Sequence, residues 1–322
     1  MDNVTSIFGN HDSVESQRDW GYGDADFDVE SVPLYYATLG EDNFVSYSPV
    51  KGKQMLLRTD NGNQLGIHGD KYKYVSHKDM INTARNILER SALDLDGIEE
   101  TIRVCDSGAM CFVQHNLPNH SIITPDGDTC KLQLLHINSH NGVWSYQGSA
   151  GGLQSACLNS QVFLKDTVSI YKSRHTYQLD IDHGARLIGK TLGMLESNNR
   201  IWAEWSGVEV SRNQVFKAIA TAANSKFSLG KLKEGCSIQD ILDMPTCYNN
   251  TSIAYMLRVW PTYKNRLGQN FWALYNTLTD WSTHFVRTSE TRKNTVDSPT
   301  QFIKNTETVR ETIKSFPRAM AA

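Results

Sequence analysis

A run of short candidate strands separated by tight turns, residues 108–164, limits the fold more than any other feature of this sequence. Residues 111–113 form one candidate strand, and the sequence Pro-Asp-Gly-Asp at 125–128 is typical of a reverse turn. A second candidate strand follows at 132–138, and Asn141-Gly142 predicts another tight reversal. Connections this short join antiparallel neighbours, so we expect an antiparallel meander.

The hairpin around Asn141-Gly142 predicts two faces of different character. If these residues fill the two central positions of a type I′ turn, Asn138 lies opposite Ser145 and His136 lies opposite Gln147. Side chains alternate along a strand. The polar face then consists of His136, Asn138, His140, Val143, Ser145 and Gln147. The core face consists of Leu135, Ile137, Trp144 and Tyr146. The polar face is either a solvated sheet surface or a binding surface.

Apolar residues at helical spacing predict helices at 77–91, 178–197, 269–286 and 300–315. Ser211 and Gln214 have the spacing of a capping box and predict one further helix start. Residues 224–250, which contain glycine and proline, are typical of a loop with one short helix. Strands followed by helices indicate an α+β fold, an antiparallel meander packed against several helices with a helical C-terminal part.

Charge is unevenly distributed along the chain. Residues 1–30 contain eight acidic residues and one basic residue, which leaves 31 basic and 27 acidic residues in the remainder. We therefore predict three regions: a flexible acidic arm at 1–31, an α+β core at 32–210, and a mainly helical region at 211–322 packed on that core. The arm either modulates a partner of the mildly basic body or only keeps the chain in solution.

Several classes of protein are disfavoured by what the sequence does not contain. It has no apolar run of membrane-spanning length and no secretory leader, which predicts a protein of the host-cell cytoplasm that does not bind membranes. The six cysteines form no Cys-x-x-Cys pair, so we expect reduced and mostly buried thiols. Phosphate-loop and dinucleotide motifs are absent, so no cofactor is expected and no catalytic residue is assigned.

Basic residues gather in two stretches that are candidates for nucleic-acid binding. The first stretch includes the cations and histidine that we assign to phosphate contacts: Lys172, Arg174, His175, Arg186 and Lys190. The second stretch places Arg258, Lys264 and Arg266 among two aromatic residues, Trp260 and Tyr263. Basic grooves with interleaved aromatic side chains commonly bind single strands, although a solvated helix face would carry the same charges.

Four blocks of the sequence resemble the family known as domain of unknown function 932, the phage/plasmid-like proteins. The blocks are 65–75, 138–142 (with Cys157 and Asn159 after it), 173–176, and 272–281 with His284. They occur in one order and cover roughly residues 60–290. The resemblance implies a protein carried by bacteriophages or other mobile genetic elements, and hence replication, recombination or repair of such DNA. The family itself has no settled activity.

The leading hypothesis is a protein that binds or anneals single-stranded DNA and works as a homo-oligomer. In it, His136, Asn138 and His140 line a groove beside the cations of the 178–197 helix. The alternatives are a metal-dependent enzyme acting on nucleic acid or nucleotide, using His136, His140, His175 and Asp182, and a factor that binds a host or phage replication protein through the acidic arm.

Overall fold

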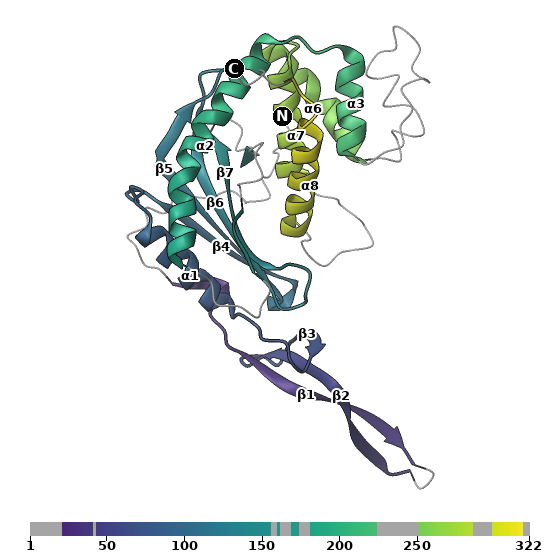
Figure 1. The fold of residues 1–322 in the computed structure, drawn as a ribbon. Coiled ribbons are helices and arrows are strands. Elements are labelled where there is room, and N and C mark those ends of the chain that lie inside the picture. The colour runs from purple at the N-terminus through teal and green to yellow at the C-terminus, as the bar shows by residue number, and fades with distance from the viewer. Residues whose placement is uncertain are drawn as a thin grey trace.

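Two antiparallel sheets of different size organise the chain (Figure 1). The computed structural model describes residues 21–40, 43–155, 160–161, 169–173, 181–223, 251–285 and 298–317. Within these ranges the sheets are combined with six α-helices, and the predicted α+β class is confirmed. None of these helices has the length and apolarity needed to cross a membrane.

The smaller sheet has three strands in the order β1-β2-β3 and extends away from the rest of the molecule (Figure 1). Its strands are β1 (Val29–Leu39), β2 (Val45–Arg58) and β3 (Gln64–Gly69). A turn at Asn61-Gly62 joins β2 to β3, with Gly62 at a φ of 71°. The outer parts of β1 and β2 extend beyond the residues that pair with β3, and most of their side chains are exposed on both faces.

The larger sheet is the predicted meander, extended by one strand before it and two after it. Its path is β4 (Glu99–Cys105), β5 (Met110–Ile123), β6 (Thr129–Ser139), β7 (Tyr146–Gln154) and β8 (Ser160–Gln161), with β9 (Ser169–Ser173) also paired to β7. The predicted turn at 125–128 joins β5 to β6, with Gly127 at a φ of 80°. Two short 3-10 helices, η1 (Gly23–Ala25) and η2 (Asp106–Gly108), precede β1 and β5.

The predicted register of the Asn141-Gly142 hairpin is wrong by one residue. His136 pairs with Gly148, and Gln147 pairs with Ile137. The reason is a wider connection than a two-residue turn: the Ser139 side chain accepts from the Trp144 backbone N–H at 2.9 Å and so closes a longer loop between β6 and β7. A one-residue shift changes which side chains share a face.

The helices follow the sequence prediction with two differences. The helices α1 (His77–Arg90), α3 (Arg212–Ala222), α7 (Phe271–His284) and α8 (Ser298–Ile313) lie where they were expected, and the capping box of Ser211 and Gln214 is confirmed. The helix α2 (Ile181–Gly207) continues ten residues beyond its predicted end at 197. The helix α6 (Thr251–Leu267) was not predicted and contains Pro261, which normally disfavours a helix interior.

One continuous apolar core joins the helices to one face of the larger sheet. It includes Val113, Leu132 and Leu134 of the sheet, Ile188 of α2 and Trp272 of α7. A smaller second core fills the other face where the base of the three-stranded sheet meets it, with Leu56 and Leu65 against Phe112 and Ile137. The larger sheet is therefore buried on both faces near this junction.

The predicted flexible arm at 1–31 ends too late. Residues 21–31 are ordered in the structure, with Ala25 and Phe27 buried and Val29 opening β1. Phe27 lies under the guanidinium of Arg58, 3.8 Å from it, and this contact anchors the segment. A few apolar residues in an acidic stretch were enough to dock it. Residues 1–20, and the predicted loop at 224–250, lie outside the described residues.

Candidate functional site

The first candidate site is the junction where β3, the start of α1 and the end of β6 meet. The Asn138 Nδ2 donates to the Val75 carbonyl at 2.8 Å and lies 3.2 Å from the His77 Nδ1. The rings of His77 and His140 follow, with their centroids 4.2 Å apart. Asn138, His77 and His140 are buried. We call these three residues, together with His68, the histidine junction.

His77 is fixed in one tautomer. Its Nε2 donates to the Gly108 carbonyl oxygen at 2.9 Å, since a carbonyl can only accept, and its Nδ1 therefore accepts from Asn138. Burial lowers the pKa of His77 to about 4, with a further contribution from the positive charge of Arg58, against the raising effect of the Gly108 hydrogen bond. A neutral imidazole with both nitrogens engaged holds the structure together and has no nitrogen left for proton transfer.

Two segments far apart in sequence, 65–75 and 138–142, are held together at this junction. The His68 Nε2 lies 2.6 Å from the His140 carbonyl oxygen, and the His68 ring stacks on Tyr72 with centroids 3.9 Å apart. The His140 backbone also donates to the Ala109 carbonyl at 2.6 Å. Two of the four sequence blocks that resemble the phage/plasmid-like family thus form one contact surface.

A strained turn borders the histidine junction. Asp106, Ser107 and Gly108 have positive φ values of 52°, 55° and 104° in succession. Left-handed backbone at residues other than glycine costs free energy and persists only where surrounding contacts enforce it. Those contacts are a hydrogen bond from the Asn141 Nδ2 to the Asp106 carboxylate at 2.7 Å and the bond from His77 to Gly108.

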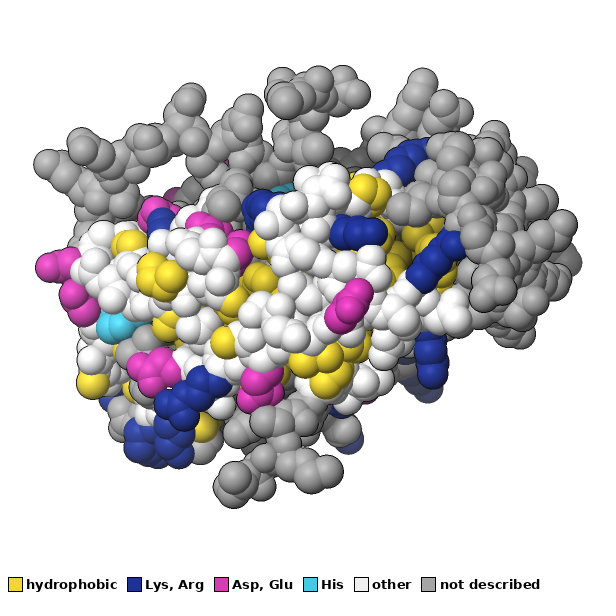
Figure 2. Space-filling model, turned by 90° about the horizontal axis from the view of Figure 1, so that it is seen from above, with side chains coloured by type: hydrophobic (Ala, Val, Ile, Leu, Met, Phe, Trp, Pro, Cys, Tyr) yellow, Lys and Arg dark blue, Asp and Glu magenta, His cyan; other side chains and the backbone are white. Residues whose placement is uncertain are grey.

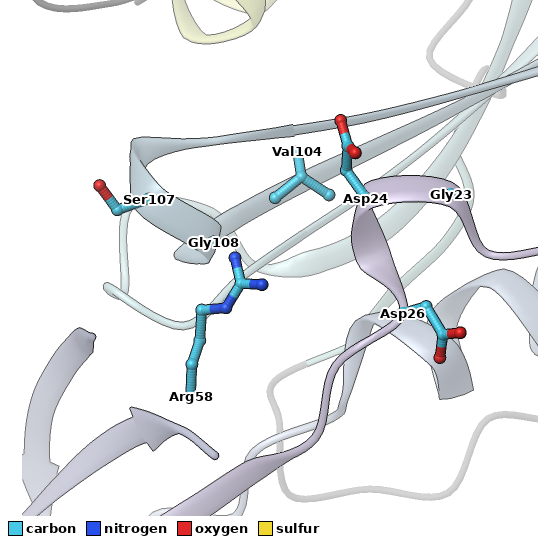
Figure 3. A pocket seen from close by; sticks show the side chains of 7 residues that line it. All are labelled: Gly23, Asp24, Asp26, Arg58, Val104, Ser107 and Gly108. Carbon is cyan, nitrogen blue, oxygen red and sulfur yellow. The ribbon is translucent and has the colours of Figure 1, made fainter. Parts of the chain in front are cut away.

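An open pocket of about 410 Å³ lies beside this turn (Figure 3). Its lining residues are Gly23, Asp24, Asp26, Arg58, Val104, Ser107 and Gly108. In Figure 3 the Arg58 side chain extends toward Gly108, whereas the side chains of Ser107 and Asp26 point away from the Arg58 guanidinium. Arg58 is already held by Asp60, at 2.6 and 2.9 Å, and Asp26 by Lys78 at 2.9 Å. Two of the charged residues that line the pocket are therefore already paired with other side chains.

A second buried polar cluster lies on the helix-covered face of the larger sheet. Arg85 of α1 forms a two-pronged ion pair with Glu100, with N···O distances of 3.0 and 2.6 Å. The other contact of Glu100 is the His115 Nε2 at 2.8 Å, and the His115 ring packs edge-on against His136. Burial alone would raise the pKa of Glu100, but the hydrogen bonds from His115 and Arg85 lower it overall. Burial lowers the pKa of His136 well below its ordinary value.

The groove predicted from the sequence is not formed. His136, Asn138 and His140 are buried, with Ile188 of α2 and Leu134 of β6 in the core on the same side of the sheet. Arg186 and Lys190 are exposed on the outer side of α2. The cover of this face by α1 explains the difference, since Asn138 bonds to Val75 and lies beside His77 at the start of that helix. Phosphate contacts by Arg186 and Lys190 stay a prediction.

Of the remaining predicted site residues, Lys172 lies in β9. Lys172 pairs with Gln147 in the larger sheet. Arg174 and His175 lie outside the described residues. Of the residues considered for a metal, His136 packs on His115 and His140 packs on His77, so the two belong to different clusters. Within the described ranges, no three His, Cys, Asp or Glu side chains come together as metal ligands.

Two helices that contact each other, α3 and α6, carry only positive formal charge in their own sequences. These helices have 11 and 17 residues and contain no Asp or Glu. Their exposed cations are Arg212, Lys217, Arg258, Lys264 and Arg266. Figure 2 shows Lys and Arg side chains gathered on the side where α3 lies in Figure 1, with few acidic side chains beside them. We call these five residues the cationic surface.

The sequence located only part of this surface. Arg258, Lys264 and Arg266 were singled out, but the aromatic residues among them, Trp260 and Tyr263, are buried at 5% and 4% exposure and cannot stack on bases. Arg212 and Lys217 were missed. The signal that would have found them is the absence of acidic residues from both helices.

The buried His77 gives the fold a defined response to acid. In the unfolded chain its pKa is near the ordinary 6.5, and in the folded chain it is about 4, so the unfolded state binds more protons between these values. The stabilisation is complete above pH 6.5 and is lost as the pH falls toward 4, by roughly 3 kcal/mol in total. His77→Gln should reduce the pH dependence of the unfolding free energy in this window by about one proton, measured by urea denaturation at several pH values. An unchanged slope would contradict the assignment.

Comparison with known proteins gives a family and no activity. A family model described as "Domain of unknown function (DUF932)" matches residues 64–308. No curated protein and no solved structure matches the chain. The matched range begins at the first residue of β3, so it includes all four residues of the histidine junction. It also includes both helices of the cationic surface.

Proposed function

Because the chain belongs to the family described as domain of unknown function DUF932, its activity has to be inferred from its own surface, and we propose that it binds single-stranded DNA. The observation that carries the proposal is the cationic surface: five exposed Lys and Arg side chains on two adjacent helices that contain no acidic residue. Phosphate neutralisation supplies most of the affinity of proteins for nucleic acid irrespective of sequence.

The members of the cationic surface are available to differing degrees. The Arg266 guanidinium lies 3.4 Å from Asp126 and is 41% exposed, so part of its charge is already compensated. Lys264 and Arg258 are exposed on α6, and Arg212 and Lys217 on α3. Arg186 and Lys190 on α2 add two further exposed cations one helical turn apart. The proposed contacts are to phosphates, which predicts binding with little dependence on base sequence.

The biological setting belongs to the same proposal. A single-strand binder in the cytoplasm of a host cell, carried by a bacteriophage or plasmid, would act in replication or recombination of that DNA, with strand annealing as the expected activity. The resemblance to phage/plasmid-like proteins supports this setting.

The test is fluorescence anisotropy with a labelled single-stranded oligonucleotide of about 30 nucleotides at increasing salt. With four to five phosphates neutralised, affinity should fall by about 100-fold between 50 and 200 mM salt. The double variant Arg258→Glu/Lys264→Glu should weaken binding by roughly 10- to 100-fold and reduce the salt slope by about 1 to 2.

The matched control is Lys71→Glu/Lys73→Glu, which makes the same change in net charge at two exposed lysines away from α3 and α6. It should bind like the unaltered protein. Equal losses in both double variants would show that only net charge matters, and no binding of the unaltered protein at 50 mM salt would exclude the proposal altogether.

A further inference from the structure

The outer half of the three-stranded sheet is a two-stranded ribbon with one apolar face. Register pairs Tyr35 with Pro49, Ala37 with Tyr47 and Leu39 with Val45, and directly paired residues share a face. We call these six residues the ribbon face. All six are exposed, with 70% of Leu39 and 72% of Tyr47 open to solvent. The opposite face between the same strands carries one exposed aromatic residue, Tyr36, paired with Ser48, and the Thr38–Ser46 pair, whose hydroxyls lie 2.7 Å apart.

The position of the ribbon explains why none of the residues that the structure describes covers this face. β3 pairs only with the inner part of β2, from Lys53 to Leu57, so the outer parts of β1 and β2 have no third strand. In Figure 1 they extend away from the helices and the larger sheet. Contiguous exposed apolar side chains of this kind mark interaction sites, and a two-stranded ribbon is only marginally stable in water on its own.

The chemistry of the ribbon face selects its partner. None of its six side chains is charged, and the five-residue connection between the strands, 40–44, contains two acidic residues, Glu41 and Asp42, and no basic one. A phosphate backbone would find no cation there, and the aliphatic Leu39 and Val45 do not stack on bases as aromatic rings do. An uncharged protein surface of aliphatic and aromatic groups is the complementary partner.

We propose that the ribbon face packs against the same face of a second copy of this chain. An isologous contact is self-complementary, and an uncharged face meets its own copy with no charge to desolvate. The strand edges are poorer sites for association, because Pro49 in the outer part of β2 cannot donate a backbone hydrogen bond. The faces are therefore left as the surfaces through which two ribbons meet.

The size of the ribbon face sets the strength of the contact. The two tyrosines, the leucine and the valine of the ribbon face are already partly buried within one copy. Covering their exposed parts would bury on the order of 400–500 Å² per copy, given about 150–250 Å² for a fully covered aromatic side chain. The total area buried on the two copies is then just below the roughly 1,200 Å² at which standard-size interfaces begin. We expect a dimer that dissociates on dilution.

The experiment is sedimentation velocity of the full chain across a wide range of concentrations, without nucleic acid. The unaltered protein should shift from monomer to dimer as concentration rises. Leu39→Asp/Tyr47→Asp places two charges on the ribbon face and should weaken dimerisation at least 100-fold. The matched control, Thr38→Asp/Ser46→Asp, places the same charges on the opposite face of the same strands and should still dimerise.

Circular dichroism and thermal unfolding of both variants verify that the body stays folded, which is expected because all four side chains are exposed. A monomeric unaltered protein at every concentration would overturn the proposal, as would equal losses in the two variants. An unaltered monomer whose oligonucleotide affinity depends on Tyr47 would identify nucleic acid as the occupant instead. The proposal does not rest on DNA binding by the cationic surface, which lies on other elements and has its own test.

Discussion

Replacing Arg85 with methionine is expected to lower the free energy of unfolding by about 3–5 kcal/mol, because removing one partner of a buried ion pair leaves the other uncompensated. The Arg85 and Glu100 side chains are only 9% and 16% exposed. The Arg85 guanidinium also donates to the Gly21 carbonyl at 2.7 Å, so the substitution additionally frees the start of the ordered chain. Urea denaturation followed by circular dichroism measures the loss.

A double-mutant cycle separates the ion pair from the packing of the long side chain. Glu100→Gln removes the charge, and the combined variant Arg85→Met/Glu100→Gln should be more stable than the sum of the two single effects predicts, by about 1–3 kcal/mol. The single variant Arg85→Met should also recover part of its loss in mild acid, where Glu100 takes up a proton. Strictly additive effects would show that the two charges are not coupled.

Gly66→Ala is expected to destabilise the fold by about 3 kcal/mol, at the upper end of the effects of overpacking. A Cβ at this position would overlap the His140 carbonyl oxygen and lie 3.1 Å from the Asn141 Cα. These are backbone atoms, and the His140 N–H is held by the Ala109 carbonyl, so the loop cannot move aside without breaking that bond. Thermal unfolding monitored by circular dichroism gives the change.

The matched control lies in the same strand. Gly69→Ala would place its Cβ 3.9 Å from the nearest atom, the Gly52 carbonyl oxygen, and the backbone at Gly69 does not have a positive φ. It should change stability by less than about 1 kcal/mol. A Gly66→Ala variant as stable as this control would mean that β3 and the loop after β6 do not approach each other as closely as the structure has them.

How far the sequence predicts this fold depends on whether a segment has a local signature. The spacing of apolar residues predicts α1, and the capping residue Ser211 predicts the start of α3. The α6 helix was not predicted, since Pro261 argues against a helix and only the burial of Trp260 and Tyr263 in the common core compensates for it. Tertiary packing of this kind leaves no trace in a short window of sequence.

The candidate sites show the same division. The polar alternation at His136, Asn138 and His140 was recognised, but alternation does not say whether a face meets water or a helix. Whether this face is buried depends on α1. The Val75 carbonyl, just before the start of α1, accepts a hydrogen bond from the Asn138 side chain. The cationic surface, by contrast, follows from the amino-acid composition of two helices, which contain basic and no acidic residues. The sequence alone singles out three of its five residues.

The shared apolar core has a consequence for how the chain can come apart. Trp202 of α2 lies against Trp272 and Tyr275 of α7, with ring centroids 5.4 and 5.9 Å apart, and the Trp205 indole N–H donates to the Pro317 carbonyl at the far end of the chain. A cut after residue 210 would therefore expose aromatic rings on both fragments. The sheet and its helices should melt as one cooperative unit, and neither half is a module that evolution or a protease could remove intact.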